Sequence, residues 1–121
     1  MSRAALIYST ISLCLTPFGA AIAANVELPP ERFDYPTVNV TVIHLSPRGV
    51  HKKCVELGAP AYVPGYGRIE GCSIMLDRLV VVPTPESVGW EKYACIWRHE
   101  IGHINGWLGD HAGGRKLPEC W

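Results

Sequence analysis

The stretch that most constrains this chain lies near its C-terminal end, where His99, Glu100 and His103 form the pattern His-Glu-x-x-His. In a helix, side chains four residues apart lie on one face, with Cβ atoms about 5–6 Å apart. His99 and His103 can then bind one metal ion, because zinc binds imidazole nitrogens at about 2.0–2.1 Å. Glu100 projects about 100° further around the helix. The pattern therefore predicts a metal-binding helix with a carboxylate beside the open position of the metal.

The residues that follow this helix offer a third ligand. Asn105 and Gly106 predict the end of the helix, because both residues tolerate the left-handed conformation. The chain can then turn back toward the histidine pair with Asp110 or His111. Neighbouring residues of an extended segment face opposite ways, so only one of them is expected to face the metal. We favour His111 as the ligand, with Asp110 accepting a hydrogen bond from a ligand histidine; the alternative, Asp110 as the third ligand, stays open.

This motif resembles the zinc-binding helix of the zincin metallopeptidases. Its continuation to Gly106 is similar to the metzincin branch, in which a third histidine follows three residues after that glycine. Here Gly109 stands at that position. Metzincins also have a methionine-containing turn further along, whereas no methionine follows Met75 in this chain. The resemblance covers about 13 residues and implies a minimal zincin-like domain rather than a complete metzincin.

The resemblance also implies an activity. Zn²⁺ held by His99, His103 and His111 would carry a water molecule, and Glu100 would act as the general base that takes its proton. The chain would then be an exported zinc-dependent hydrolase, a metallopeptidase acting on a peptide or protein substrate. Two alternatives stay open: a non-catalytic zinc-binding protein with the same ligands, and an envelope interaction module whose zincin helix is vestigial.

The first 23 residues have the features of a signal peptide. Arg3 supplies the positive charge, residues 4–15 form an apolar run, and Ala21 and Ala23 supply the small residues of a cleavage site. The run is shorter than the roughly 20 residues of a membrane span. We therefore expect cleavage after Ala23, export to the periplasm or the medium, and no membrane span in the mature chain.

The charge of the chain is balanced, with 11 Lys and Arg against 11 Asp and Glu. No basic stripe stands out, and a basic stripe is the feature that proteins use to bind nucleic acid. Nucleic acid is therefore not an expected partner. A peptide or protein substrate is expected, with an envelope protein as a further possible partner.

Four cysteines remain after the expected cleavage: Cys54, Cys72, Cys95 and Cys120. An even number of cysteines in a small exported domain predicts two disulfides, which compensate for a limited core. Three pairings are possible, and we favour Cys54–Cys72 with Cys95–Cys120. Cysteine as a metal ligand is the weaker alternative, because export favours oxidation.

The pattern of the remaining chain predicts an α+β fold. We expect residues 24–37 to form an extended, loosely held lead-in and residues 38–121 to form the zincin-like metal-binding domain. Alternating and β-branched residues predict a sheet of about three strands, and Ser46 with Pro47 predicts the start of a helix that ends at Gly58. The expected strands cover residues 38–45, 69–75 and 79–82.

The last expected helix is the active-site helix, which begins near residue 86 or 88 and ends at residue 105. Five residues at spacings of three or four predict an apolar face. The opposite face is expected to carry Cys95 and the histidine pair, turned toward the metal. The residues of the apolar face are Trp90, Tyr93, Trp97, Ile101 and Ile104.

Overall fold

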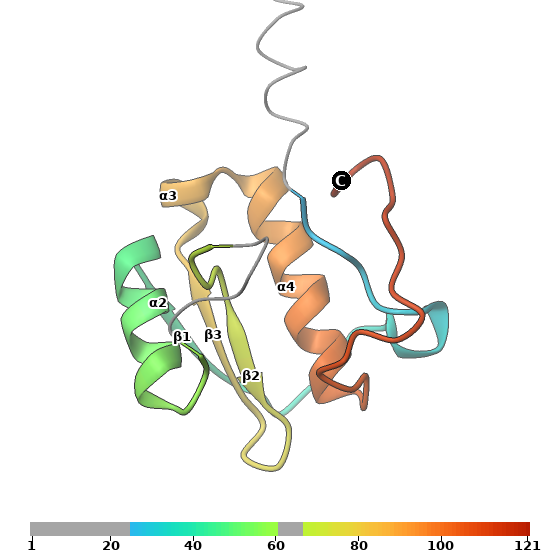
Figure 1. The fold of residues 1–121 in the computed structure, drawn as a ribbon, viewed down its shortest axis with the longest axis horizontal. Coiled ribbons are helices and arrows are strands. Elements are labelled where there is room, and N and C mark those ends of the chain that lie inside the picture. Colours follow the sequence, from blue (N-terminus) through green and yellow to red (C-terminus); the bar gives the residue numbers. More distant parts are fainter. Residues whose placement is uncertain (1–24, 61–66) are drawn as a thin grey trace, which may run out of the picture.

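A three-stranded mixed sheet lies between helices in the computed structural model, which describes residues 25–60 and 67–121 (Figure 1). The expected signal peptide, residues 1–23, lies outside the described residues. The α+β fold class, a small sheet packed on a long helix with a further helix beside it, is confirmed. Within residues 25–60 and 67–121, no helix is both long and apolar enough to cross a membrane.

The sheet has the strand order β1-β3-β2. Strand β1 (Thr41–Leu45) is parallel to β3 (Leu79–Pro83), and β2 (Cys72–Ile74) is antiparallel to β3. The first two strands are shorter than expected from the sequence. The first strand starts only at Thr41, because Asn39 has a positive φ of 59° and its carbonyl accepts a hydrogen bond from Arg78 at 3.0 Å.

The central strand β3 supplies side chains to both faces of the sheet. Val80 and Val82 belong to the core beneath helix α4 (Trp90–Ile104), and Val81 belongs to a second core beneath helix α2 (Pro47–Glu56). All three valines are fully buried. The alternation follows from strand geometry, in which successive side chains point to opposite faces.

Helix α2 begins and ends where the sequence predicts. The hydroxyl oxygen of Ser46 accepts a hydrogen bond from the Gly49 N–H at 3.2 Å, and Pro47 is the first helical residue. Gly58, just beyond the helix, has a φ of 107°, a conformation that glycine adopts without steric cost.

The C-terminal helical region is divided in two. A single turn, α3 (Pro85–Val88), precedes α4, and the two are separated by Gly89, which has a φ of 90°. The expected division of α4 into two faces is wrong at two positions. Trp90, at the first position of the helix, is 67% exposed, and Cys95 is buried in the same core as Ile101.

Both expected disulfides are confirmed. Cys54–Cys72 joins α2 to β2, and Cys95–Cys120 joins α4 to the C-terminal tail. Each bridge therefore ties one helical layer to a segment distant in sequence. Two disulfides in so small a chain point to an oxidising environment.

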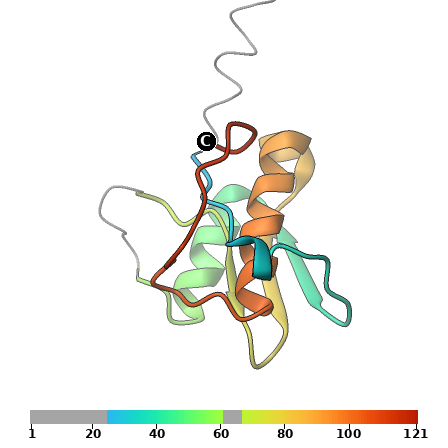
Figure 2. The same cartoon turned by 90° about the vertical axis from the view of Figure 1, so that its right-hand side faces the viewer.

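The N-terminal lead-in is not loosely held, which corrects the expectation from its composition. Leu28 is completely buried, and its N–H and carbonyl exchange hydrogen bonds with the backbone of Arg115 at 2.8 and 2.7 Å. The Val26 N–H donates to the Cys120 carbonyl at 2.7 Å. A 3₁₀ turn, η1 (Glu31–Phe33), follows. Figure 2 shows this segment and the tail running together beside α4.

Candidate metal centre

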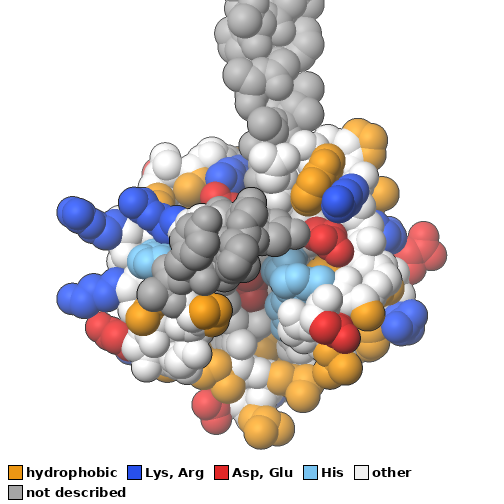
Figure 3. Space-filling model, viewed as in Figure 1, with side chains coloured by type: hydrophobic (Ala, Val, Ile, Leu, Met, Phe, Trp, Pro, Cys, Tyr) orange, Lys and Arg blue, Asp and Glu red, His pale blue; other side chains and the backbone are white. Residues whose placement is uncertain are grey.

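Three histidine side chains meet beside helix α4. His99 and His103 come from α4, and His111 comes from the tail that follows it. The Nε2 atom of His103 lies 3.2 Å from Nε2 of His99 and 3.1 Å from Nε2 of His111. Histidine side chains are visible near the centre of the molecular face in Figure 3, with acidic side chains close by. The structure therefore brings together the three histidines that the sequence singled out.

The tail reaches the helix through an anchor that the sequence analysis missed. Trp107 is 3% exposed, and its ring stacks on the ring of His103 with centroids 4.7 Å apart. Its indole N–H donates to the Ala112 carbonyl at 2.9 Å. Gly106, with a φ of 115°, makes the turn that lets the chain fold back. The position of Trp107 directly after the helix-ending Gly106 is the feature of the sequence that could have predicted this anchor.

Two of the histidines have a defined orientation. Nδ1 of His99 lies 2.5 Å from the Glu27 carbonyl oxygen, and Nδ1 of His103 lies 2.7 Å from the Trp107 carbonyl oxygen. A carbonyl only accepts hydrogen bonds, so in both rings Nδ1 carries the proton and donates. The lone pair is then on Nε2, the atom that faces the other histidines. Such outer hydrogen bonds fix the orientation of metal-binding histidines.

The protonation of the three rings suits metal binding. Burial lowers the pKa of His99, His103 and His111 below the ordinary value of 6.5. The rings therefore remain neutral at lower pH than a free imidazole would. Neutral imidazole is the form that binds metals.

The spacing of the nitrogens fits a metal ion. Two nitrogens bound to one zinc ion at about 2.0–2.1 Å, at a tetrahedral angle, lie about 3.3–3.4 Å apart. The observed distances of 3.1 and 3.2 Å are close to that value. His99, His103 and His111 could therefore hold a metal ion, and three protein ligands leave a coordination position open.

Glu100 lies on the buried side of this group. It is 5% exposed, and its Oε2 accepts a hydrogen bond from the Ser73 hydroxyl at 3.0 Å. Burial raises the pKa of Glu100 to about 7, although the nearby His103 and the Ser73 hydrogen bond oppose that shift. Ser73 lies on β2, so the sheet positions the carboxyl group.

Strand β2 is preceded by a glycine that makes room for this carboxyl group. A Cβ atom at Gly71 would lie 3.1 Å from Oε1 of Glu100 and 3.0 Å from a side-chain carbon of Ile96. Both distances are tighter than ordinary van der Waals contact, so a larger residue at position 71 would press on Glu100. Neither Gly71 nor Ser73 was singled out in the sequence, because nothing local relates them to α4.

Asp110 lies outside the histidine group. Its Oδ1 accepts a hydrogen bond from the Ala112 N–H at 3.0 Å, and its side chain is exposed. His111, which has a φ of 58°, is the tail residue whose ring meets the pair on α4. Asp110 thus shapes the turn that carries His111.

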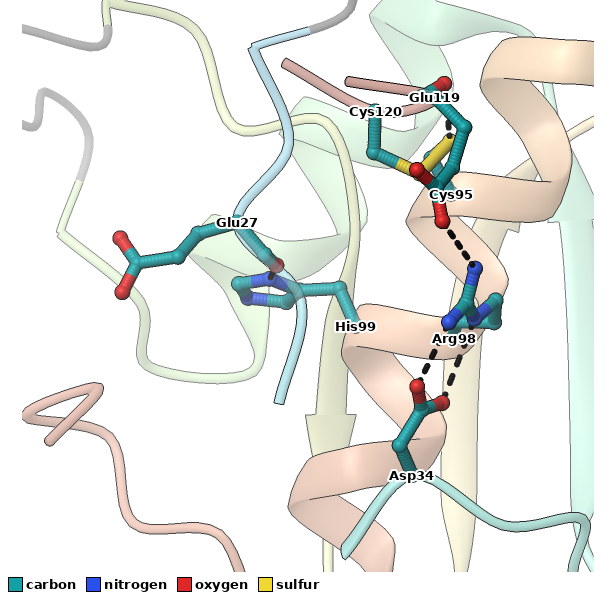
Figure 4. Close-up of a disulfide and its surroundings, with 7 residues drawn as sticks. All are labelled: Glu27, Asp34, Cys95, Arg98, His99, Glu119 and Cys120. Carbon is teal, nitrogen blue, oxygen red and sulfur yellow. Dashed lines mark hydrogen bonds and ion pairs between the residues drawn. A yellow bond between two sulfur atoms is a disulfide. The ribbon is translucent and has the colours of Figure 1, made fainter. Parts of the chain in front are cut away.

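A second polar cluster lies on the other side of His99 (Figure 4). Oδ2 of Asp34 lies 2.6 Å from the guanidinium groups of both Arg98 and Arg115. The hydrogen bond from Arg98, followed by that from Arg115, lowers the pKa of Asp34 below 3.8, and burial opposes the shift. This cluster connects the N-terminal segment, α4 and the tail, which are the three segments that surround the histidines.

Comparisons of this chain with protein-family models, with curated proteins and with solved structures found no match. The functional argument therefore depends on the site itself: three convergent imidazoles, a buried carboxyl group beside them, and the segments that position both.

Proposed function

We propose that this chain is an exported zinc-dependent hydrolase, specifically a metallopeptidase, in which His99, His103 and His111 hold Zn²⁺. The observation that carries the proposal is the convergence of three imidazole nitrogens beside the buried carboxyl group of Glu100. A structural zinc site ordinarily has four protein ligands, whereas a catalytic site has three and an open position.

The choice of zinc follows from the chemistry of the ligands. All three donors are neutral imidazoles, and sets of three histidines are found in catalytic zinc sites. The four cysteines of the described chain are paired in disulfides, so no thiolate competes for the ion. A bound zinc ion would supply a Lewis acid that polarises a substrate carbonyl and makes water more acidic.

Glu100 is the proposed general base. A general base is most effective when its pKa is near the working pH, and burial raises the pKa of Glu100 to about 7. Glu100 accepts a proton from the attacking water and then donates it to the leaving amine. The Ser73 hydroxyl holds the carboxyl group in one orientation during both transfers.

The Glu100→Gln variant tests this role. We expect it to retain zinc, because the three histidines are unchanged, and to lose peptide hydrolysis by at least about 100-fold, which is the usual contribution of a general base. Glu91→Gln is the matched control, since Glu91 is an exposed carboxylate in the first turn of the same helix. Cleavage of a fluorogenic peptide mixture and metal analysis of all three proteins give the readout.

The other outcomes of this experiment identify the alternatives. If wild type and the Glu100→Gln variant both bind zinc and neither hydrolyses any peptide, the chain is a non-catalytic zinc-binding protein. If the double variant His99→Ala, His103→Ala folds and captures the same envelope partner as wild type, the histidines do not serve binding and the chain is an interaction module. Hydrolysis by Glu100→Gln at the wild-type rate would refute the proposed mechanism.

A further inference from the structure

A second carboxylate, Glu27, lies beside the histidines and has no part in the proposed reaction. Its backbone is fixed, because its carbonyl accepts a hydrogen bond from Nδ1 of His99. The residues on either side are also fixed, since the N–H groups of Val26 and Leu28 donate to backbone carbonyls of the tail. Glu27 is therefore held at a defined place next to a proposed ligand.

The side chain of Glu27 extends to the same side of α4 as the ring of His99, away from Arg98 and Asp34 (Figure 4). Its carboxylate packs against Gly114, where an added Cβ atom would collide with it. It is not one of the residues grouped as metal ligands.

The negative charge of Glu27 acts on two of the three histidines. Burial lowers the pKa of His99 and His111, and the negative charge of Glu27 opposes that shift in both rings. For His103, the carboxylate that opposes the shift is Glu100. Glu100 is buried, whereas Glu27 is partly exposed and contacts His99 through its backbone carbonyl.

The charge of Glu27 has no cationic partner within residues 25–60 and 67–121. Arg98 on α4 and Arg115 on the tail form ion pairs with Asp34 instead. A partly exposed carboxylate without a cationic partner, carried by a fixed backbone beside the histidines, suits a cationic group of a ligand, because charge-assisted hydrogen bonds are stronger than neutral ones.

We propose that the Glu27 carboxylate binds the α-ammonium group at the N-terminus of a peptide substrate. This inference rests on the proposed metal centre and names its substrate class. In a peptide, one Cα separates the α-ammonium nitrogen from the first carbonyl carbon. An ammonium group held at Glu27 therefore places the first peptide carbonyl near the histidines, and the enzyme removes residues from free N-termini.

Two hydroxamates test the inference without relying on catalysis. Leucine hydroxamate and N-acetyl-leucine hydroxamate carry the same metal-chelating group, but only the first has a free ammonium group. We expect the zinc-loaded wild type to bind leucine hydroxamate at least about tenfold more tightly, the gain of roughly one charge-assisted hydrogen bond. Isothermal titration at pH 6.5 measures both affinities.

Two variants perturb Glu27 in independent ways. Glu27→Gln removes the charge, and Gly114→Ala displaces the carboxylate by filling the space against which it packs. The backbone at Gly114 does not have a positive φ, so its conformation allows alanine, and the Glu27 side chain is the group that has to move. Both variants are expected to lose the preference for leucine hydroxamate, to bind the acetylated compound as wild type does, and to retain their zinc. Glu91→Gln, the exposed control, keeps the preference.

Each other result overturns the inference. Equal affinity of wild type for the two hydroxamates, or an unchanged preference in Glu27→Gln, overturns it and leaves the metal centre intact. Loss of zinc from Glu27→Gln shows that the carboxylate maintains the metal site and does not select the substrate. Failure of wild type to bind either hydroxamate overturns this inference together with the proposed metal centre.

Discussion

The two faces of the sheet are covered by helices that bury different kinds of residue. On the α2 face, the buried cluster consists of Val50, Cys54 and Val81, all apolar. On the α4 face, the apolar core lies next to Glu100, the buried charged residue of the described chain, and next to three partly buried histidines. Each face is tied by one disulfide.

This difference distinguishes the α2 face, which contributes to stability, from the α4 face, to which we assign the function. Burying an ionisable group costs free energy, so a face selected only for stability would resemble the α2 face. Groups with perturbed pKa values gather at functional sites for that reason. The α4 face contains such groups in one place, and the segments that hold them come from both ends of the described chain.

Histidine substitutions on the two faces give the largest expected contrast. His103→Ala removes the ring whose Nε2 lies 3.2 Å from Nε2 of His99 and 3.1 Å from Nε2 of His111. We expect this variant to lose at least about 100-fold in zinc affinity. His51→Ala, on α2, removes only an acceptor for the Ile69 N–H and leaves zinc affinity unchanged. Competition with a chromogenic chelator measures both. Equal zinc affinity of the two variants would contradict the assignment of function to the α4 face.

Removal of each disulfide tests the same difference between the α2 face and the α4 face. Replacing either pair of cysteines with serine is expected to lower the free energy of unfolding by about 2–4 kcal/mol in urea denaturation. Only loss of Cys95–Cys120 should also weaken zinc binding, because that bridge anchors the tail that carries His111. The Cys54–Cys72 variant is the matched control. The distinction would fail if both variants lost zinc affinity to the same extent.

The pH dependence of stability tests the burial of Glu100 in the metal-free protein. Its pKa is about 7 in the folded chain against 4.5 as the ordinary value, so between these values the folded state binds the extra proton. Unfolding free energy therefore decreases as pH rises from 4.5 to 7, by about 3 kcal/mol in total. The Glu100→Gln side chain has no proton to lose. The variant should therefore have the same free energy of unfolding as wild type near pH 4.5 and a higher one above pH 7.

The comparison of these two proteins cancels the opposing contributions of His99 and His111, but only part of that of His103, because the charge of Glu100 raises the pKa of His103. The pKa values of the three histidines are lowered in the folded state, so their contribution is present above pH 6.5 and is lost as pH falls. Urea denaturation of both proteins across pH 4.5–8 gives the difference between their free energies of unfolding. If this difference in free energy does not change with pH, Glu100 is not buried as described.

Local sequence signals predicted those parts of the fold that depend on local geometry. Ser46 and Pro47 set the start of α2, and the i, i+4 spacing of His99 and His103 placed both on one side of α4. The division of the last helical region at Gly89 was not expected, because glycine inside a helical pattern is often tolerated. In the structure the Gly89 N–H donates to the Pro85 carbonyl at 2.8 Å and its carbonyl accepts from the Tyr93 N–H at 2.9 Å, so Gly89 ends α3 and begins α4.

The groups that complete the site depend on contacts distant in sequence. The Glu27 carbonyl and His99 are separated by 72 residues, Ser73 and Glu100 by 27, and Asp34 and Arg98 by 64. No periodic pattern relates such residues, so the sequence predicted the three histidines that come together but not the groups that orient them. The lead-in was expected to be loose because its prolines remove periodicity, yet its apolar side chains complete the core.

Zinc content is the most direct test of the central claim, that the three histidines form a metal centre. The oxidised chain beginning at Ala24 is dialysed against a weak chelator and analysed by inductively coupled plasma mass spectrometry. The account predicts about one zinc ion per chain, as expected for a three-histidine site. A chain that is folded and disulfide-bonded but retains no metal would contradict it.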